Sequence, residues 1–303
     1  MKPIAVGVVG YNRIGKRVVD AIARQPDLRL TSIIETDPKR IGVLQALELP
    51  LDNGASLTRV MECQVVVLCD GTHPTPSVSC VYGPDMPVSL PLFGVAQPQP
   101  VQCCRVPCAD ALAFSRLLSS LPPVERLFSS CARRCDPATD HRFASVDALE
   151  PMFEELDDDK DIRAILGLLT SVSIRRTRLP YTQSHLHHVK LDLQSSLSRE
   201  DALTALKSAP RCRVAQGAAR FVNTGQLQEF DRDLGRPRGD RPEVFVWEES
   251  VATIDRCLFL TIDVSPDATP VPDIIDAVRQ LAFPDVSLAE AQQLTNFYLG
   301  IKG

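Results

Sequence analysis

Six residues near the N-terminus have the spacing of a phosphate-binding loop. Residues 10–15 read Gly-Tyr-Asn-Arg-Ile-Gly, the G-x-G-x-x-G pattern of dinucleotide-binding loops with Asn12 in place of the middle glycine. Asparagine tolerates the positive φ of such turns, but its side chain would lie where a pyrophosphate usually sits. Arg13 and the N-terminus of the following helix would offset that cost. The residues expected to bind a dinucleotide here are Gly10, Asn12, Arg13, Ile14 and Gly15.

The elements around this loop are those of a βαβ unit. Residues 4–9 are an apolar run typical of a strand buried on both faces, and apolar residues recur at helical spacing from Ile14 onward. Residues 28–34 form a second strand, and Glu35 follows it. An acid at this distance binds ribose hydroxyls and would repel a 2′-phosphate, which predicts NAD rather than NADP. A role for Glu35 as a solvated turn residue remains open.

A pair of histidines lies on a predicted strand over residues 185–193. Alternation places His185 and His187 on one face with apolar residues, and His188 on the other. One histidine on an apolar face is usually a core residue, whereas two flanking a single position are typical of an active site. A metal site built on all three is disfavoured because His188 points away. No metal is therefore assigned.

Length and composition limit the class of protein. The 303 residues suggest two domains, and 44% hydrophobic and 23% charged residues are typical of globular chains. The formal charge of -5, without a long basic run, disfavours nucleic acid and anionic membranes as partners. No apolar run reaches the roughly 18 residues of a membrane span, and no signal pattern opens the chain. We expect a cytoplasmic protein.

Cysteine spacing gives no metal or disulfide framework. Ten cysteines occur, and two pairs have C-x-x-x-C spacing, Cys104 with Cys108 and Cys131 with Cys135. Zinc and iron–sulfur sites usually use C-x-x-C, and a chain of this size needs no disulfides. Most of these thiols are expected to be small buried hydrophobes.

Periodicity and capping residues predict the remaining elements. Residues 71–102 are rich in proline, glycine and serine and are predicted as loops around short strands. The other predicted strands are 64–68, 244–247 and 258–264. The predicted helices are 109–118, one from the Ser198 cap through Lys207, 272–281 and 287–298.

Several segments together resemble the archaeal-type (type II) glyceraldehyde-3-phosphate dehydrogenases. GYNRIGKRVVDAI resembles the GYGTIGKRVADAI loop and helix of that family, and PYTQSHLHHVKLDL resembles its proline, threonine and MHxH strand. RPEVFVWEESV resembles its PEV…W-E-S-I strand, VPDIIDAVR its VPENIDAIR helix, and LTNFYLGIKG its ITNESLGILKG tail. The matches span nearly the whole chain in the family's order.

The resemblance implies a fold and an activity. The expected fold is α/β, with a Rossmann-type NAD(P)-binding domain over residues 1–107 and 286–303 and an inserted α+β catalytic domain over residues 108–285. The implied activity is that of an NAD(P)-dependent aldehyde dehydrogenase acting through a cysteine thioester. The implied partners are a small aldehyde or acyl substrate and further copies of the chain, in a dimer or tetramer.

The same resemblance implies catalytic residues. The segment that corresponds to the family's SCNTT motif contains Cys108 before a predicted helix, so Cys108 is the expected nucleophile and Cys104 the alternative. His185 is the expected base, and His187 either positions it or contacts the substrate. Because most of the ten cysteines are expected to be buried core residues, a structural role for Cys108 also remains open.

Residues outside the catalytic pair are implied to bind ligands. Arg133 and Arg134 resemble an arginine pair that grips substrate or inorganic phosphate, the alternative being a surface ion pair. Asn296 stands where the family's final helix contacts the nicotinamide carboxamide. The alternative for Asn296 is a helix cap.

The sequence also departs from the family at the expected nucleophile. Ala109-Asp110-Ala111 replaces Asn-Thr-Thr, and Asp110 would raise the pKa of a neighbouring thiol and repel a phosphorylated substrate. Together with Asn12, this supports a second hypothesis, a non-catalytic member that serves as a nucleotide-binding or protein-interaction scaffold. A third hypothesis keeps the thiol chemistry for another aldehyde or acyl compound.

Overall fold

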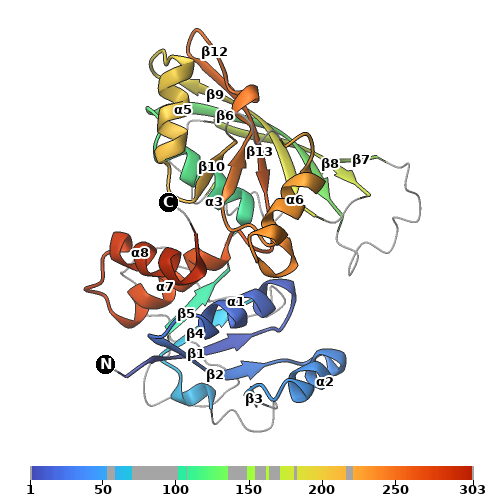
Figure 1. Ribbon diagram of the computed structural model, residues 1–303, viewed down its shortest axis with the longest axis vertical. Coiled ribbons are helices and arrows are strands. Elements are labelled where there is room, and N and C mark those ends of the chain that lie inside the picture. Colours follow the sequence, from blue (N-terminus) through green and yellow to red (C-terminus); the bar gives the residue numbers. More distant parts are fainter. Residues whose placement is uncertain are drawn as a thin grey trace. The chain divides into compact units, whose positions relative to one another are not determined.

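The computed structural model describes most of the chain as two compact units. The described residues are 2–52, 59–69, 102–106, 108–135, 149–153, 162–163, 171–180, 183–215 and 221–301, without the side chains of Met61 and Arg105. Residues 1–106 and 270–302 form what we call the N-terminal unit, and residues 107–269 form the central unit (Figure 1). The predicted loops between residues 71 and 101 lie outside the described residues.

A parallel sheet forms the middle of the N-terminal unit. Its described strands follow the order β3-β2-β1-β4-β5, and every pairing is parallel. Their bounds are β1 Ile4–Val9, β2 Leu28–Ile34, β3 Leu51–Asp52, β4 Val65–Leu68 and β5 Gln102–Arg105. All six residues of β1 are buried, as its apolar run predicts. The strands predicted over 4–9, 28–34 and 64–68 are confirmed.

Four described helices complete this unit. They are α1 Arg13–Ala23, α2 Pro38–Ala46, α7 Val271–Ala282 and α8 Leu288–Leu299, and a short 3₁₀ turn spans Val60–Glu62. Helix α7 packs against α1, β4 and β5, and α8 packs against α7. The buried Arg279 guanidinium on α7 bonds both carboxylate oxygens of Asp27, at 2.7 and 2.8 Å, and the Thr295 hydroxyl on α8. These bonds tie both late helices to the start of β2.

The second boundary of the N-terminal unit differs from the expectation. The chain returns to this unit at Pro270, not at residue 286. Ile274, Ile275 and Val278 explain the difference, because they belong to the same buried cluster as strands β1 and β4. The helix at 272–281 was predicted correctly, but its apolar face was assigned to the wrong core.

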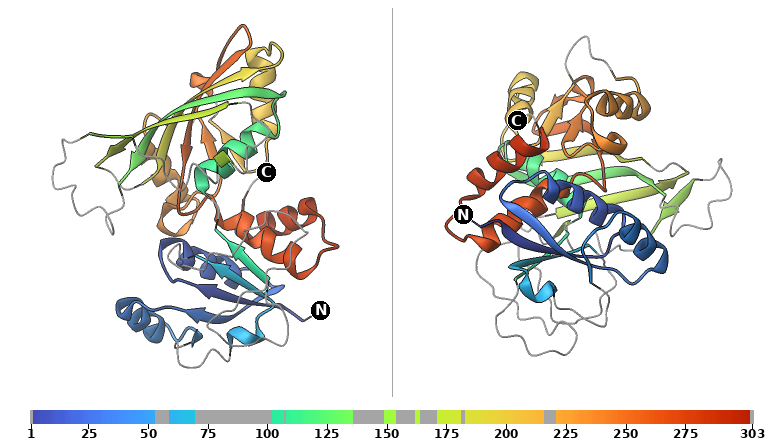
Figure 2. Two further views of the ribbon diagram at one scale, coloured as in Figure 1. Left: turned by 180° about the vertical axis from the view of Figure 1, so that it is seen from behind. Right: turned by 60° about the horizontal axis from the view of Figure 1, so that its bottom comes forward.

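A mixed sheet forms the middle of the central unit (Figure 2). Its described strands follow the order β10-β11-β13-β9-β6-β8-β7, and β12 pairs with β13. Their bounds are β6 Val124–Arg134, β7 Glu150–Met152, β8 Ser171–Leu179, β9 His185–Leu193, β10 Cys212–Val214, β11 Val244–Val246, β12 Ala252–Ile254 and β13 Cys257–Val264. The described helices are α3 Ala109–Leu118, α5 Arg199–Ser208 and α6 Thr224–Asp233, with short 3₁₀ turns at Pro237–Gly239 and Glu248–Ser250.

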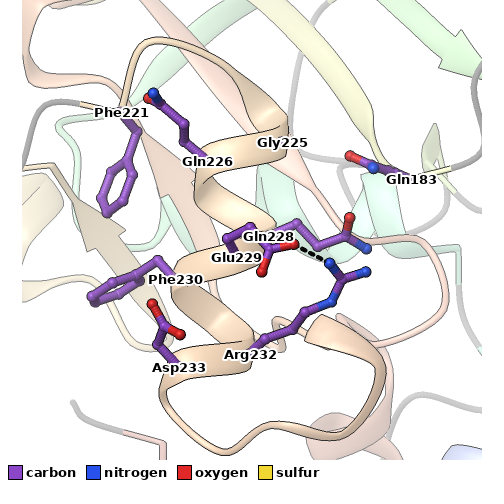
Figure 3. Close-up of a pocket in the computed structure, with 9 residues that line it drawn as sticks. All are labelled: Gln183, Phe221, Gly225, Gln226, Gln228, Glu229, Phe230, Arg232 and Asp233. Carbon is purple, nitrogen blue, oxygen red and sulfur yellow. Dashed lines mark hydrogen bonds and ion pairs between the residues drawn. The ribbon is translucent and has the colours of Figure 1, made fainter.

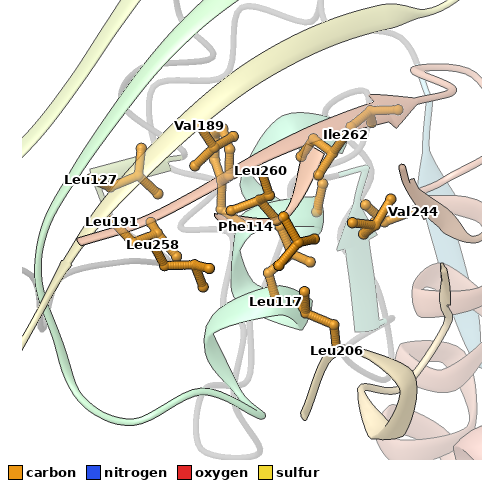
Figure 4. Close-up of a cluster of buried hydrophobic side chains, with 14 of the residues drawn as sticks. Phe114, Leu117, Leu127, Val189, Leu191, Leu206, Val244, Leu258, Leu260 and Ile262 are labelled. Atoms are coloured by element: carbon orange, nitrogen blue, oxygen red, sulfur yellow. The ribbon is translucent and has the colours of Figure 1, made fainter. Parts of the chain in front are cut away.

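One face of this sheet is covered by α3. Phe114 and Leu117 of α3 lie in one buried cluster with Val189 and Leu191 of β9 and Leu260 of β13 (Figure 4). Burying each such side chain contributes roughly 1.5–3 kcal/mol. The alternation predicted for residues 185–193 is confirmed, since every second side chain of β9 is buried. This face therefore holds both predicted histidines.

The observed architecture confirms the expected α/β fold, a Rossmann-type parallel sheet followed by an α+β unit. Among the residues described above, no helix combines the length and the apolarity needed to cross a membrane.

Candidate active site

The register of two central strands brings four polar side chains of the site together. Strands β6 and β9 are antiparallel neighbours, and Cys131 lies opposite His187. Because side chains alternate along a strand, Ser129 and Cys131 share the face of β6 that His185 and His187 share on β9. All four side chains are buried under α3.

Asp110, in the first turn of α3, contacts both histidines. Its side chain is 1% exposed, and Oδ1 lies 3.0 Å from Nδ1 of His185 and 3.3 Å from Nε2 of His187. Burial alone would raise the pKa of Asp110, but the two imidazoles hold it well below its usual range. Asp110 is thus a carboxylate that accepts hydrogen bonds from two rings.

His185 has the surroundings of a general base. Burial lowers its pKa, Asp110 opposes this, and the nearby charges of Arg133 and His187 add to the lowering. A neutral His185 donates its Nδ1 hydrogen to Asp110 and keeps the Nε2 lone pair as an acceptor. Its side chain retains 6% exposure, whereas that of His187 retains none.

His187 supports the site from within the core. Its Nδ1 lies 3.0 Å from the Ser129 hydroxyl and its Nε2 lies 3.6 Å from the Cys131 sulfur. The Phe114 ring packs edge-on against the imidazole, with centroids 5.3 Å apart. Burial would lower the pKa of His187, but Cys131 and Asp110 raise it to about 10. Of the two roles expected for His187, this burial favours positioning His185 through Asp110 over contact with a substrate.

Asp110 therefore has a different environment from the one the sequence predicts. It was expected to act against a neighbouring thiolate, and the structure instead pairs it with two imidazoles. Sequence reasoning also missed Cys131 as part of this cluster. An acid in the first turn of a helix and an H-x-H strand were both visible, but the register that joins them to Cys131 is a long-range property.

Cys108 is the N-cap residue of α3. It has extended backbone angles, φ -61° and ψ 128°, and lies partly buried against the central core. A thiol at a helix N-terminus gains from the positive end of the helix dipole, which favours the thiolate. The alternative, Cys104, lies on β5 and packs against the core of the N-terminal unit. Of the two, Cys108 is the one joined by a single turn of chain to Asp110.

The arginine pair is divided between two environments. Arg134 forms a bidentate ion pair with Asp267, with N–O distances of 3.0 and 2.5 Å, and each side chain is 10% exposed. A substrate phosphate would have to displace this carboxylate. The charge of Arg133 contributes to the lowered pKa of His185, so Arg133 lies near that imidazole.

The glycine loop closes tightly on itself. Gly10 has φ 87°, and a Cβ on Gly15 would lie 2.0 Å from the Gly10 carbonyl oxygen, so both positions require glycine. Asn12 has φ -79°, and the positive φ expected there is at Gly10. The Oδ1 of Asn12 accepts hydrogen bonds from the backbone N–H groups of Ile14 and Gly15, at 3.0 and 2.9 Å. These are N–H groups that a pyrophosphate would use.

The buried side chain of Glu35 holds the backbone of the same loop by hydrogen bonds. Its carboxylate accepts hydrogen bonds from the backbone N–H groups of Tyr11, Thr36 and Asp37, at 2.7, 2.8 and 2.9 Å. Arg40 lies 3.5 Å from one carboxylate oxygen. Because the residue is 6% exposed, the alternative of a solvated turn residue is wrong.

Asn296 lies half-buried on α8, one residue after the buried Thr295. Its carbonyl oxygen accepts the N–H of Ile301 at 2.9 Å, and the helix ends at Gly300 in a left-handed conformation. These bonds involve the backbone, so contact of the side chain with a nicotinamide stays a prediction.

A pocket of about 630 Å³ lies elsewhere in the central unit, along α6 (Figure 3). Its lining includes Phe221, Phe230, Gln228 and the exposed ion pair of Glu229 with Arg232. The residues that line it include the carboxylates of Glu229 and Asp233 but neither a histidine nor a cysteine, so they lack the thiol and the imidazole that the expected chemistry needs.

Comparisons with known proteins agree with the resemblance read from the sequence. The chain is 25% identical to a glyceraldehyde-3-phosphate dehydrogenase of Hyperthermus butylicus, covering 99% of this chain and 98% of that protein. It is 24% identical to the Methanocaldococcus jannaschii protein of the same name, with 99% and 100% covered. It is 26% identical to glyceraldehyde-3-phosphate dehydrogenase 2 of Methanosarcina barkeri, with 99% of each covered. No family model matches the chain.

Solved structures share the fold at lower identity. The aspartate semialdehyde dehydrogenase II of Vibrio cholerae superposes with a TM-score of 0.66 at 10% identity, covering 94% of this chain and 100% of that one. The same enzyme in complex with ASA gives a TM-score of 0.66 at 9% identity. The chain is thus similar over nearly its full length to archaeal glyceraldehyde-3-phosphate dehydrogenases, and it shares its fold with a semialdehyde dehydrogenase.

Proposed function

We propose that this protein is a nicotinamide-dependent aldehyde dehydrogenase in which Cys108 is the nucleophile and His185 the base. The observation that carries the proposal is the 3.0 Å contact between Asp110 and Nδ1 of His185, in the first turn of the helix that Cys108 caps. Asp110 orients the imidazole of His185 and stands two residues after Cys108, so it links the proposed base to the end of α3 that carries the proposed nucleophile. The relatives' names as dehydrogenases support an oxidoreductase.

The residues of the chain perform the acid and base steps. His185 takes the thiol proton of Cys108, and the thiolate bonds to the aldehyde carbon while the carbonyl oxygen takes that proton back. His185 then removes the hydroxyl proton as the carbon is oxidised to a thioester. Water or phosphate cleaves the thioester, which releases the acyl product and restores the thiol. A bound NAD(P) supplies one property, an acceptor for the hydride.

The glycine loop fits a dinucleotide at a defined cost. Gly10 and Gly15 give the tight turn, but a pyrophosphate can reach the N–H groups of Ile14 and Gly15 only if the Asn12 side chain leaves them. Losing an N-cap costs about 1 kcal/mol, or about fivefold in affinity. Arg13 would contact the phosphates, and Asn296 the carboxamide. Because Glu35 carries a carboxylate at the end of β2, NAD is the proposed cofactor in preference to NADP.

A small aldehyde without a phosphate group is the proposed substrate. The guanidinium of Arg134 is already in an ion pair with Asp267, and Asp110 adds a buried negative charge to the site. Both features act against a phosphorylated substrate. Arg133 remains the proposed contact for a carboxylate or carbonyl of the substrate.

The first test is calorimetric titration with NAD and with NADP, using Asn296→Ala as the comparison variant. We expect NAD to bind more tightly than NADP and both to weaken in the variant. A screen of short aldehydes would follow on the wild type and on Cys108→Ser. Absence of binding by both cofactors would contradict the proposal.

A non-catalytic scaffold is the second candidate, and two observations favour it. Asn12 satisfies N–H groups that bind phosphate in dinucleotide loops, and Glu35 is engaged by three backbone N–H groups. Alkylation of Cys108 separates the candidates. A catalytic thiol reacts much faster than a free cysteine at neutral pH, and a structural thiol does not.

A further inference from the structure

The side chains of Asp110, Cys131, His185 and His187 form a compact group with the composition of a metal site. Each offers one ligand atom, and these atoms all lie within 4.8 Å of one another. All four residues are buried, and they come from α3, β6 and β9. The sequence assigned no metal, because the cysteine spacing was unsuitable and His188 points to the other face.

The donor atoms suit zinc. Two imidazole nitrogens, one thiolate and one carboxylate are ligand types that Zn²⁺ binds in four-coordinate sites. Bonds of about 2.0–2.3 Å in a tetrahedron place the ligand atoms about 3.3–3.6 Å apart. The separations here are 3.0 Å from Asp110 to His185, 3.3 Å from Asp110 to His187, and 3.6 Å from Cys131 to His187. Small side-chain movements would therefore complete the geometry.

Charge and orientation support the same conclusion. A carboxylate and a thiolate balance the two positive charges of Zn²⁺, which leaves a neutral centre in an apolar core. Oδ2 of Asp110 is buried and has no hydrogen-bond partner, so the site has unused ligand capacity. The Ser129 hydroxyl, 3.0 Å from Nδ1 of His187, fixes that ring with Nε2 toward the group, as outer-shell partners of metal ligands do.

We infer that Asp110, Cys131, His185 and His187 bind one Zn²⁺ ion, and that its binding inhibits the enzyme by removing His185 as the base. The binding part stands on the cluster alone, and the inhibitory part rests on the proposed function. Activity would then depend on the concentration of free zinc, and the zinc-free protein would be the active form.

The test uses Zn²⁺ and Co²⁺ as probes on the whole chain after treatment with a chelator. We expect one equivalent of Zn²⁺ to compete with a chromophoric chelator, and Co²⁺ to give the charge-transfer absorption of a thiolate ligand with the strong visible bands of a four-coordinate ion. Cys131→Ser should lose the charge-transfer band. The affinity of this variant for Zn²⁺ should fall by more than about 100-fold. Loss of a residue that only supports a metal ligand costs about 10–100-fold, so the larger loss identifies Cys131 as a ligand.

Matched variants keep the test decisive. His188→Gln changes the exposed histidine of the same strand, and Cys257→Ser changes a thiol outside the cluster, so both should bind zinc as the wild type does. If Cys131→Ser fails to fold, Asp110→Asn keeps the side-chain shape. Zinc should raise the Tm of the wild type and of His188→Gln but not that of Asp110→Asn.

The outcomes separate this inference from the proposed function. No uptake by the wild type, or a cobalt spectrum without a thiolate band, would overturn the metal site and leave the dehydrogenase proposal intact. Zinc binding in a protein without aldehyde oxidation would support the site and count against the proposed function. Tight binding that leaves aldehyde oxidation unchanged would overturn the inhibition and the assignment of His185 as base.

Discussion

The glycine loop of the N-terminal unit and the histidine cluster of the central unit use buried polar groups in opposite ways. In the loop, the side chains of Asn12 and Glu35 accept hydrogen bonds from backbone N–H groups of the same βαβ unit. In the cluster, one carboxylate oxygen of Asp110 serves two imidazoles and the other has no partner. The loop therefore has the sequence pattern of a ligand site, but its polar side chains already bond the protein's own backbone. The cluster departs from the sequence motif of the resembled family, but one of its carboxylate oxygens is still available to a ligand.

This difference teaches that a sequence motif such as the glycine loop predicts the path of the backbone more reliably than it predicts a bound ligand. The spacing of Gly10 and Gly15 follows from the turn itself, since a side chain at Gly15 would strike the Gly10 carbonyl. The residues after Cys108 differ from the Asn-Thr-Thr that the resemblance leads one to expect, yet one of them, Asp110, contacts both histidines. Substitutions in the two regions should therefore have different readouts.

The largest expected effect is at the nucleophile. Cys108→Ser should abolish aldehyde oxidation, because a serine hydroxyl lacks the acidity and nucleophilicity of the thiol, and no acyl-enzyme should form in a mass spectrum. Cys257→Ser is the matched control, since Asp192 raises the pKa of that partly exposed thiol. Activity that survives Cys108→Ser but not Cys131→Ser would move the nucleophile to Cys131.

The next effect is at the base. His185→Asn should lower kcat by about 10²–10⁴-fold, because an amide cannot take up and release the proton. The Asn amide can still donate a hydrogen bond to the buried carboxylate of Asp110, so the variant should fold. His188→Asn, three positions along the same strand, should keep its activity. Equal losses in the two variants, measured by steady-state kinetics, would show that the cluster has no special role.

A smaller effect, on stability, is expected at Glu35. Glu35→Gln replaces a buried carboxylate that accepts three backbone hydrogen bonds, so it should destabilise the fold by about 1–3 kcal/mol in denaturant unfolding. Glu229→Gln, at an exposed ion pair, should cost less than about 1 kcal/mol. If Glu35→Gln instead leaves stability unchanged, the three backbone hydrogen bonds do not stabilise the loop and the contrast between the two regions fails.

The smallest expected effect is at Asn12. Asn12→Gly frees the N–H groups of Ile14 and Gly15 and should strengthen NAD binding by about fivefold in calorimetry, the amount assigned above to displacing the cap. The accompanying loss of stability should be a few tenths of a kcal/mol from the cap, plus the lost bond to the Cys69 carbonyl. Weaker binding in this variant would mean that the Asn12 side chain itself contacts the dinucleotide.

Local patterns predicted much of the fold. The bounds of β1, β2, α3 and β9 agree with the predicted ranges, because each is a run with a clear period and a distinct end. Helix α2 was missed since its apolar residues do not gather on one face, with Leu44 its one buried side chain. Strands β6 and β8 were also missed, and their parallel pairing joins segments far apart in the chain.

The candidate site was predicted less completely than the fold. His185 and His187 were found because alternation is a local property, and it gave their shared face correctly. The partners of these histidines depend on the register of β6 against β9 and on the helix that covers them, which no local pattern encodes. For the same reason, Asp267 was not foreseen as the partner of Arg134.

The discontinuous N-terminal unit has a consequence for synthesis of the chain. Its core combines Val6 and Val65 from the first sheet with Ile275 and Val278 of α7, and residues 107–269 are made in between. At about 5–20 residues per second, a ribosome needs about 10–30 s for that interval. During this time the sheet edge and its apolar face have no α7 to cover them, while the central unit emerges as one uninterrupted segment. The nascent chain should therefore bind chaperones through its first hundred residues, and release from them should coincide with the emergence of α7.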